Sequence, residues 1–209
     1  MINIVNEFNT YKNSIGNRVA LYRSVAKAFQ IKSALYPGSH IDIMPSFVIP
    51  DVTYIDNFKG TVKFFNEMEA IHRFIDENKE YDGECKLNFI DSDYKKSLEI
   101  EPVDLIISQF AGFVGQETKR YLKAGGILLC NDSHGDATLD FCDEDYTFVG
   151  VIAFNNKIET KNLDSYFQFA RKRPIDIGKV KGTMKGPNYK VKAENYLFRK
   201  NNMERWDNA

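Results

Sequence analysis

Residues 34–56 read ALYPGSHIDIMPSFVIPDVTYID, and this stretch is the most informative part of the sequence. A short apolar run ends at the breaker pair Pro37-Gly38, and a second strand-like run over residues 52–55 ends at Asp56. A glycine turn after one strand and a carboxylate at the end of the next are what an α/β sheet uses to hold a nucleoside-containing ligand. The pattern therefore favours a ligand-binding α/β domain over a purely structural one.

Outward from this stretch, apolar runs alternate with amphipathic segments along most of the chain. Strands are predicted over residues 31–36, 52–55, 85–90, 103–108, 127–130, 147–154 and 196–199. Helices are predicted over residues 17–30, 58–78, about 115–123 and 163–171, and a loop over 178–187. Repeated strand-then-helix steps imply an α/β fold: one doubly wound domain with a mostly parallel sheet of about seven strands and helices on both faces.

Composition limits the possible classes of protein. The 209 residues are 43% hydrophobic and 13% aromatic, which suffices for one core and leaves little for a second. The chain has no run of about 18 apolar residues and no leader-like start, so we expect a soluble, cytoplasmic protein that does not enter a membrane. Its three cysteines lack a C-x-x-C spacing, which predicts neither a disulfide framework nor a zinc site.

Charge is distributed unevenly along the chain. The net charge is -1, yet residues 171–209 hold 11 Lys and Arg against 4 Asp and Glu. Such a tail neutralises nucleic-acid phosphates, with nearby aromatic side chains as stacking surfaces, or packs against the acidic remainder of its own domain. The sequence leaves both roles open, and the nucleic-acid role falls on residues 171–200.

Polar residues follow the predicted strands, where ligands of open α/β sheets bind. Gly38 permits a positive φ and close approach to the backbone, although a plain turn between two elements has the same sequence. Asp56 is suited to accept both ribose hydroxyls, or alternatively caps the helix that follows it. Asp91 is suited to an adenine edge, or is a simple loop carboxylate. The candidate binding residues are Tyr36, Gly38, Ser39, His40, Asp56, Asn57, Asp91, Ser92 and Gln109.

Asp132, His134 and Asp136 form the one cluster with acid-base potential. A histidine beside carboxylates moves protons near neutral pH, so His134 and Asp132 are the candidate catalytic residues. A hydrogen-bonded loop is the simpler alternative, and no second His/Cys cluster completes a metal site. The chain lacks the G-x-S-x-G, G-x-x-x-x-G-K-[ST] and H-E-x-x-H motifs, which argues against the common hydrolase, NTPase and metalloprotease classes.

The order of these features resembles that of the class I S-adenosylmethionine-dependent methyltransferases over about residues 17–154. The segment Leu-Lys-Ala-Gly-Gly-Ile-Leu-Leu at 122–129 is similar to the Leu-Lys-Pro-Gly-Gly turn of that family. The resemblance implies a Rossmann-like fold that binds S-adenosylmethionine. It also implies that the Gly38 loop holds the methionine part, Asp56 the ribose, and Asp91-Ser92 the adenine.

This resemblance divides the chain into three segments. Residues 1–33 form an N-terminal helical segment, 34–154 the Rossmann-like cofactor-binding core, and 155–209 a basic extension that completes the sheet. The expected function is methyl transfer to an unknown acceptor. The alternative is a degenerate domain that binds a nucleotide or nucleic acid without catalysis, which is favoured by the presence of one glycine where the family has three. A nicotinamide-dependent oxidoreductase is disfavoured, because G-x-G-x-x-G is absent.

Overall fold

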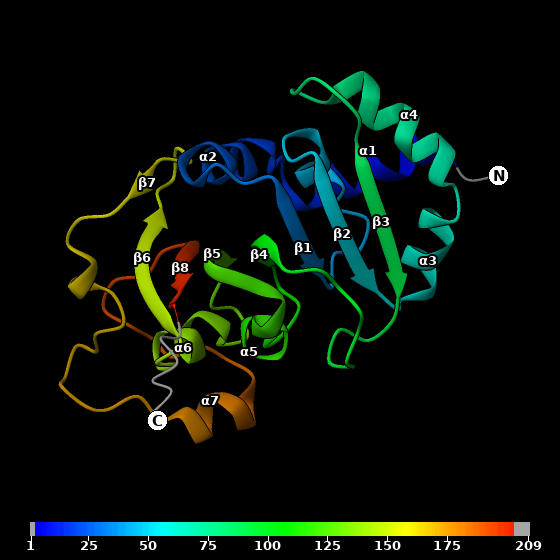
Figure 1. The fold of residues 1–209 in the computed structure, drawn as a ribbon. Coiled ribbons are helices and arrows are strands. Elements are labelled where there is room, and N and C mark those ends of the chain that lie inside the picture. Colours follow the sequence, from blue (N-terminus) through cyan, green and yellow to red (C-terminus); the bar gives the residue numbers. More distant parts are fainter. Residues whose placement is uncertain (1–2, 203–209) are drawn as a thin grey trace, which may run out of the picture.

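The computed structural model describes residues 3–202 and forms one α/β domain around an eight-stranded mixed sheet (Figure 1). The strand order is β3-β2-β1-β4-β5-β8-β6-β7. The strands are β1 (Ser33–Pro37), β2 (Asp51–Asp56), β3 (Lys86–Asp91), β4 (Val103–Ser108), β5 (Leu122–Cys130), β6 (Tyr146–Ile152), β7 (Ile158–Glu159) and β8 (Asn195–Lys200). All strands from β1 to β5 are parallel, and β8 runs antiparallel to both of its neighbours, β5 and β6.

Helices cover both faces of the sheet, as the strand-then-helix pattern predicts. One face packs against α1 (Ile4–Ile15), α2 (Val19–Phe29), the 3-10 turn η1 (Met44–Phe47), α3 (Lys59–Phe65) and α4 (Met68–Asn78). The other face packs against α5 (Val114–Thr118), the 3-10 turn η2 (Lys119–Tyr121) and α6 (Asp136–Phe141), with α7 (Ile177–Thr183) against α6. No helix within residues 3–202 has the length and hydrophobicity needed to span a membrane.

Alternation along β1 explains how the sheet acquires two cores. Ala34 and Tyr36 face the core beneath α1 to α4, whereas Leu35 faces the core beneath α5 and α6. Successive side chains of a strand point to opposite faces, so a wholly apolar strand is stable only when both faces are covered. The apolar runs in the sequence therefore mark the central strands β1 and β4, which are buried on both sides.

Several predicted elements differ from the observed ones. The helix predicted over 58–78 is two helices, because the chain turns at Asn66 and Glu67. The helix predicted over about 115–123 ends at Thr118, and residues 122–126 already belong to β5. Only a 3-10 turn, η3 (Leu163–Ser165), forms within 163–171, where Phe167 has φ +56° and is buried in the aromatic core. Residues 177–183, predicted as mostly loop, form α7 because Asp176 caps them.

The strand order reverses between β1 and β4. From β1 the chain adds β2 and β3 on one side, and then crosses to add β4 and β5 on the other. At such a reversal, the loops leaving the two central strands diverge and open a crevice beyond their carboxyl ends. The fold therefore brings the residues that follow β1, β2, β4 and β5 to one edge of the sheet.

Candidate functional site at the carboxyl edge of the sheet

The loop after β1 lies directly against the loop after β4. The N–H of Gly38 donates to the carbonyl of Ile55 at 2.7 Å, and the φ of Gly38 is +65°. A Cβ at Gly38 would lie 2.4 Å from the Cβ of Ala111, a distance that real side chains do not reach. Glycine is therefore required here both by backbone conformation and by close packing at the strand reversal.

Asp56 ties the loop after β1 to the end of β2. Its carboxylate accepts the N–H of His40 at 2.9 Å and the N–H of Phe58 at 2.8 Å, one on each oxygen. The bond from Phe58 closes a turn just before α3, but Asp56 does not cap that helix, whose N-cap residue is Phe58 and which has no side-chain cap. Each carboxylate oxygen has about two acceptor sites, which leaves acceptor capacity for a ligand.

The ring of His40 lies in an aromatic stack beside this carboxylate. It packs between Tyr11 of α1, at 4.6 Å between ring centroids, and Phe58, at 5.7 Å. Burial lowers the pKa of His40, although the nearby Asp56 opposes this shift. Nδ1 of His40 is buried and has no hydrogen-bond partner among residues 3–202.

The remaining candidates near β1 to β3 are distributed between the interior and the surface. Tyr36 is buried, and its hydroxyl donates to Asp42 at 3.2 Å, so it belongs to the core beneath α2 and η1. Ser39 is also buried, whereas Asn57 and Asp91 are exposed and Ser92 is half-buried. Asp56 and Asp91 are register partners across β2 and β3, which places both carboxylates at the same edge of the sheet.

A cavity of about 510 Å³ opens between the α1–α2 connection, the ends of β4 and β5, and the start of β8. Among the predicted site residues, Gln109 and Asp132 line it. Other side chains in its wall are Arg18, Phe110, Asn131, Lys192 and Asn195. The volume lies within the range of roughly 300–1,000 Å³ that is usual for small-molecule sites.

Three amide side chains form a connected chain in the cavity wall. Gln109 donates from Nε2 to Oδ1 of Asn195 at 2.7 Å, and Asn131 donates from Nδ2 to Oε1 of Gln109 at 3.3 Å. All three residues are at least nine-tenths buried, with exposed fractions of 6% for Gln109, 6% for Asn131 and 9% for Asn195. Amides offer donors and acceptors side by side, so this wall can pair with a ligand that does the same.

Phe110 is strained and exposed at the mouth of the cavity. It directly follows Gln109, has φ +59°, and leaves 59% of its surface accessible. The guanidinium of Arg18 lies 5.3 Å from its ring centroid and 3.6 Å from the buried carboxylate of Asp42. A left-handed φ at a residue with a side chain costs about 1–2 kcal/mol, and such strain concentrates at ligand sites.

The three residues of the predicted acid-base cluster, Asp132, His134 and Asp136, lie in different surroundings. Asp132 lines the cavity, where its two oxygens accept the N–H and the hydroxyl of Thr138, each at 2.8 Å. Burial raises the pKa of Asp132, against the effect of these bonds. His134 is half-buried, and its Nδ1 lies 3.1 Å from the hydroxyl oxygen of Ser133. Asp136 instead accepts from Ser108 and from the N–H of Gly115, in the interior beneath α5.

Two features of the site are not marked in the local sequence. Arg18 stands in the short connection between two helices, and Asn195 stands 86 residues after the glutamine that it contacts. No pattern of spacing joins either residue to the strand ends. Within residues 3–202, no group of three or more His, Cys, Asp or Glu side chains is placed to hold a metal ion.

Comparison with known proteins found similar solved structures but no matching sequence family. No family model and no curated protein matches the sequence. A proposed O-methyltransferase from Klebsiella pneumoniae matches at 8% identity, with 97% of this chain and 91% of that chain covered and a TM-score of 0.55. The plantazolicin methyltransferase BpumL, solved with SAH, matches at 13% identity over 95% and 89%, with a TM-score of 0.54. A methyltransferase from Geobacter sulfurreducens matches at 14% identity over 74% and 85%, with a TM-score of 0.51. These likenesses show that the chain has the Rossmann-like fold of class I S-adenosylmethionine-dependent methyltransferases.

Proposed function

We propose that this protein is an S-adenosylmethionine-dependent methyltransferase whose site is the carboxyl edge of the sheet from β3 to β5. The observation that carries the proposal is the strand order, with its reversal between β1 and β4 and its antiparallel β8. Known methyltransferase structures share this fold over nearly the whole chain. A fold hosts several functions, so the residues at the edge must support the proposal as well.

Asp56 is the residue that fits the cofactor best. Its carboxylate is held in place by His40 and Phe58, and it retains acceptor capacity for the two ribose hydroxyls. The exposed carboxylate of Asp91 lies in register with it at the end of β3, where an adenine amine finds an acceptor. We assign Asn57 and Ser92, which adjoin these two residues, to the same part of the site.

The loop after β1 fits the methionine part only after a rearrangement. Ala111 fills the space beside Gly38, so a ligand reaches the Gly38 backbone only if the loop after β4 moves. That loop contains two left-handed residues, Phe110 and Gly112, which concentrate its strain at the point where it must move. We propose that residues 110–112 shift to admit the ligand, with Ser39 and Gln109 on either side of it.

When bound, the cofactor supplies a methyl carbon that an acceptor lone pair attacks, while the carbon–sulfur electron pair stays on sulfur and the acceptor proton leaves to a base or to water. The protein has to align the two reactants and exclude water. We assign the acceptor to the cavity, where Gln109, Asn131 and Asn195 orient it. Asp132 is one of two carboxylates in the cavity wall, the other being Glu194, and it is the first candidate for receiving the proton, with His134 as the second.

One observation favours the noncatalytic alternative. The contact between Gly38 and Ala111 closes the place where a methionine part would approach the backbone. If the loop after β4 never opens, the remaining surface would bind a nucleotide, or a nucleic acid through residues 171–200, without methyl transfer. Binding of the intact cofactor therefore separates the two functions.

Titration calorimetry with S-adenosylmethionine and with S-adenosylhomocysteine tests the proposal. We expect micromolar binding of both, weakened about ten- to a hundredfold in Asp56→Ala, because a hydrogen bond to a charged group contributes about 1.5–3 kcal/mol. Asp51→Ala, at the opposite end of β2, is the matched control and should bind normally. Absence of binding at millimolar ligand would reject the methyltransferase function and leave the noncatalytic alternative.

A further inference from the structure

Residues 171–192 form a basic segment whose cations are unpaired. The segment contains eight Lys and Arg residues and a single acid, Asp176. All eight cations are exposed, and none takes part in the seven ion pairs formed among residues 3–202. Asp176 is occupied as the N-cap of α7, where it accepts the N–H of Lys179 at 2.9 Å. The segment therefore forms no ion pair within residues 3–202 and presents its charge to solvent, although burial raises the pKa of Asp132 and Lys192 lies close enough to oppose this rise.

The basic segment is fixed against the cavity. Gly186 lies so close to Asp132 that a Cβ there would be 2.1 Å from its carboxylate, and Val180 packs equally tightly on Gly135. Gly186, Pro187 and Lys192 belong to the cavity wall. Further back, the N–H of Lys190 donates to the carbonyl of Gln168 at 2.7 Å. Of the eight cations, Lys192 lies in the wall of the cavity where the acceptor would bind, and Lys185 directly precedes Gly186 in that wall.

The cavity has the chemistry that a nucleobase requires. The oxygens of Gln109, Asn131 and Asn195 already accept hydrogen bonds within the protein, so these amides offer a base edge their remaining N–H donors, among them Nδ2 of Asn195. Phe110 presents an exposed ring at the mouth, and the flat, cationic guanidinium of Arg18 lies 5.3 Å from the centroid of that ring. Stacking on an aromatic ring holds any base, because every base has a π face.

We propose that the acceptor is a nucleobase of a single-stranded nucleic acid, with the base in the cavity and the phosphates along residues 171–192. This inference rests on the proposed function and names the substrate class of the same site. A small anionic acceptor would need one or two cations, whereas eight unpaired cations on a continuous segment match a chain of phosphates. Enzymes that modify a base act on a single strand or extrude the base from a duplex, and a cavity of about 510 Å³ admits one base.

Fluorescence anisotropy with labelled single-stranded RNA and DNA, in the absence of cofactor, tests this assignment. The oligonucleotides are about 12 nucleotides long, within the length that one single-strand-binding domain covers. We expect binding that weakens with salt. Tighter binding of one nucleic acid identifies the acceptor as RNA or as DNA. Equal binding shows that the protein recognises the bases and phosphates that RNA and DNA share. Absence of binding to either strand at low salt overturns the inference.

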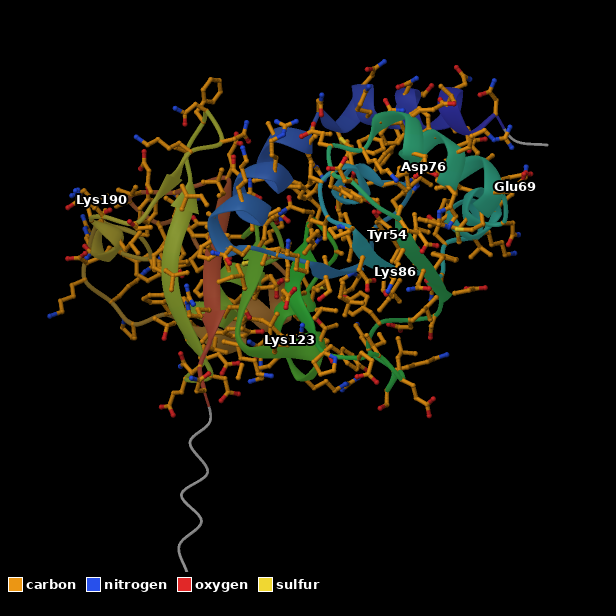
Figure 2. All side chains as sticks on the ribbon, turned by 45° about the horizontal axis from the view of Figure 1, so that its top comes forward. Tyr54, Glu69, Asp76, Lys86, Lys123 and Lys190 are labelled. Atoms are coloured by element: carbon orange, nitrogen blue, oxygen red, sulfur yellow. The ribbon has the colours of Figure 1, made fainter. Side chains whose placement is uncertain are left out.

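Matched variants separate the phosphate contacts from general charge. We expect Lys185→Gln, Lys190→Gln and Lys192→Gln together to lower the affinity at least tenfold, and the slope of log K against log salt to fall by about 2. The control replaces Lys27, Lys63 and Lys86 by Gln, which removes the same charge from exposed positions elsewhere. Figure 2 shows Lys190 on the β6 side of the molecule and Lys86 on β3 at the other. Equal losses in both triple variants contradict a phosphate path along the basic segment.

Phe110→Ala tests the base contact. Loss of stacking should weaken binding about tenfold with the salt slope unchanged, and Phe110→Tyr should restore it. Unchanged affinity in Phe110→Ala would place the base outside the cavity and overturn the inference. These assays contain no cofactor, so the two hypotheses are tested separately. If the protein binds S-adenosylmethionine but no nucleic acid, the nucleobase acceptor is rejected and the methyltransferase function stands. If it binds nucleic acid but no S-adenosylmethionine, the methyltransferase function is rejected.

Discussion

The backbone N–H of His40 donates to the carboxylate of Asp56 over 2.9 Å, and this bond joins the loop after β1 to the end of β2. The other oxygen of Asp56 accepts the N–H of Phe58. One side chain thereby fixes two loops at the edge where we place the cofactor. Asp56 has a structural role as well as its proposed binding role, and the two can be measured separately.

Asp56→Ala should destabilise the protein as well as weaken ligand binding. Removal of the carboxylate leaves the N–H groups of His40 and Phe58 without their acceptor, so we expect the free energy of unfolding to fall by about 1–3 kcal/mol. Asp56→Asn keeps one acceptor oxygen and should lose less. Urea unfolding of both variants measures the effect, and a fully stable Asp56→Ala would show that these bonds do not hold the loops.

Gly38→Ala should be destabilising for two separable reasons. The added methyl group would lie 2.4 Å from the Cβ of Ala111, and the φ of +65° disfavours any side chain by about 1–2 kcal/mol. Ala111→Gly in the Gly38→Ala background should recover the steric part and leave the conformational part. Thermal unfolding of the two single variants and the double variant gives the coupling. Strictly additive effects would mean that these two loops are not in contact.

Loss of one amide in the cavity wall should leave its partners unsatisfied. Gln109→Leu removes the donor to Asn195 and the acceptor for Asn131, both of which are buried. We expect a loss of about 1–3 kcal/mol in the free energy of unfolding, since each orphaned buried polar group carries a desolvation penalty. Ser92→Ala is the control, because it also removes a polar side chain beyond a strand end but at a half-buried position, so it should change stability little. A Gln109→Leu protein as stable as the parent would contradict the amide chain.

The contribution of Asp136 to stability should decrease as the pH rises from 4 to 7. Burial raises the pKa of Asp136 to about 7, although bonds from Ser108 and Gly115 favour its charged form. The folded state then holds a proton that the unfolded state releases above its ordinary pKa of 3.8. The stabilisation is complete below that value and is lost by pH 7, with a slope of at most about 1.4 kcal/mol per pH unit.

Guanidinium unfolding between pH 5 and 8 measures this slope. Asp136→Asn should reduce it, because the amide is neutral throughout. Asp143→Asn is the matched control: although burial acts in the opposite direction, the hydrogen bond from Lys119 lowers the pKa of Asp143, so its contribution changes only at more acidic pH. An Asp136→Asn protein with the parental slope would assign the pH dependence elsewhere.

Much of the fold could be predicted from local pattern. The runs that became β1, β2 and β4 are apolar because these strands are buried, and the breaker pair Pro37-Gly38 marks the end of β1. The order of elements resembles that of the methyltransferases, and solved methyltransferases share the observed fold. Helix ends were less well predicted. A local window does not reveal that Leu122 pairs with Val103 of β4, or that the irregular residues 123–126 belong to β5 and not to a helix.

The candidate site was only partly visible in the sequence, because it depends on contacts between distant residues. Asp56 and Gln109 were identifiable, since each polar side chain directly follows an apolar strand. Arg18 was not, because its neighbours Phe110 and Asp42 come from other parts of the chain. The tight contact between Gly38 and Ala111 was equally hidden, since a lone glycine has the same sequence in an open turn and in a closed one.

A crystal structure of the protein with S-adenosylhomocysteine tests the central claim most directly. We expect the ligand to lie across the carboxyl edge of the sheet, with its ribose hydroxyls hydrogen-bonded to Asp56 and its amino-acid end towards Gln109. We also expect the loop of residues 110–112 to have moved away from Gly38. A ligand bound elsewhere, or crystals grown at millimolar ligand with Ala111 still against Gly38 and no ligand at Asp56, would contradict the account.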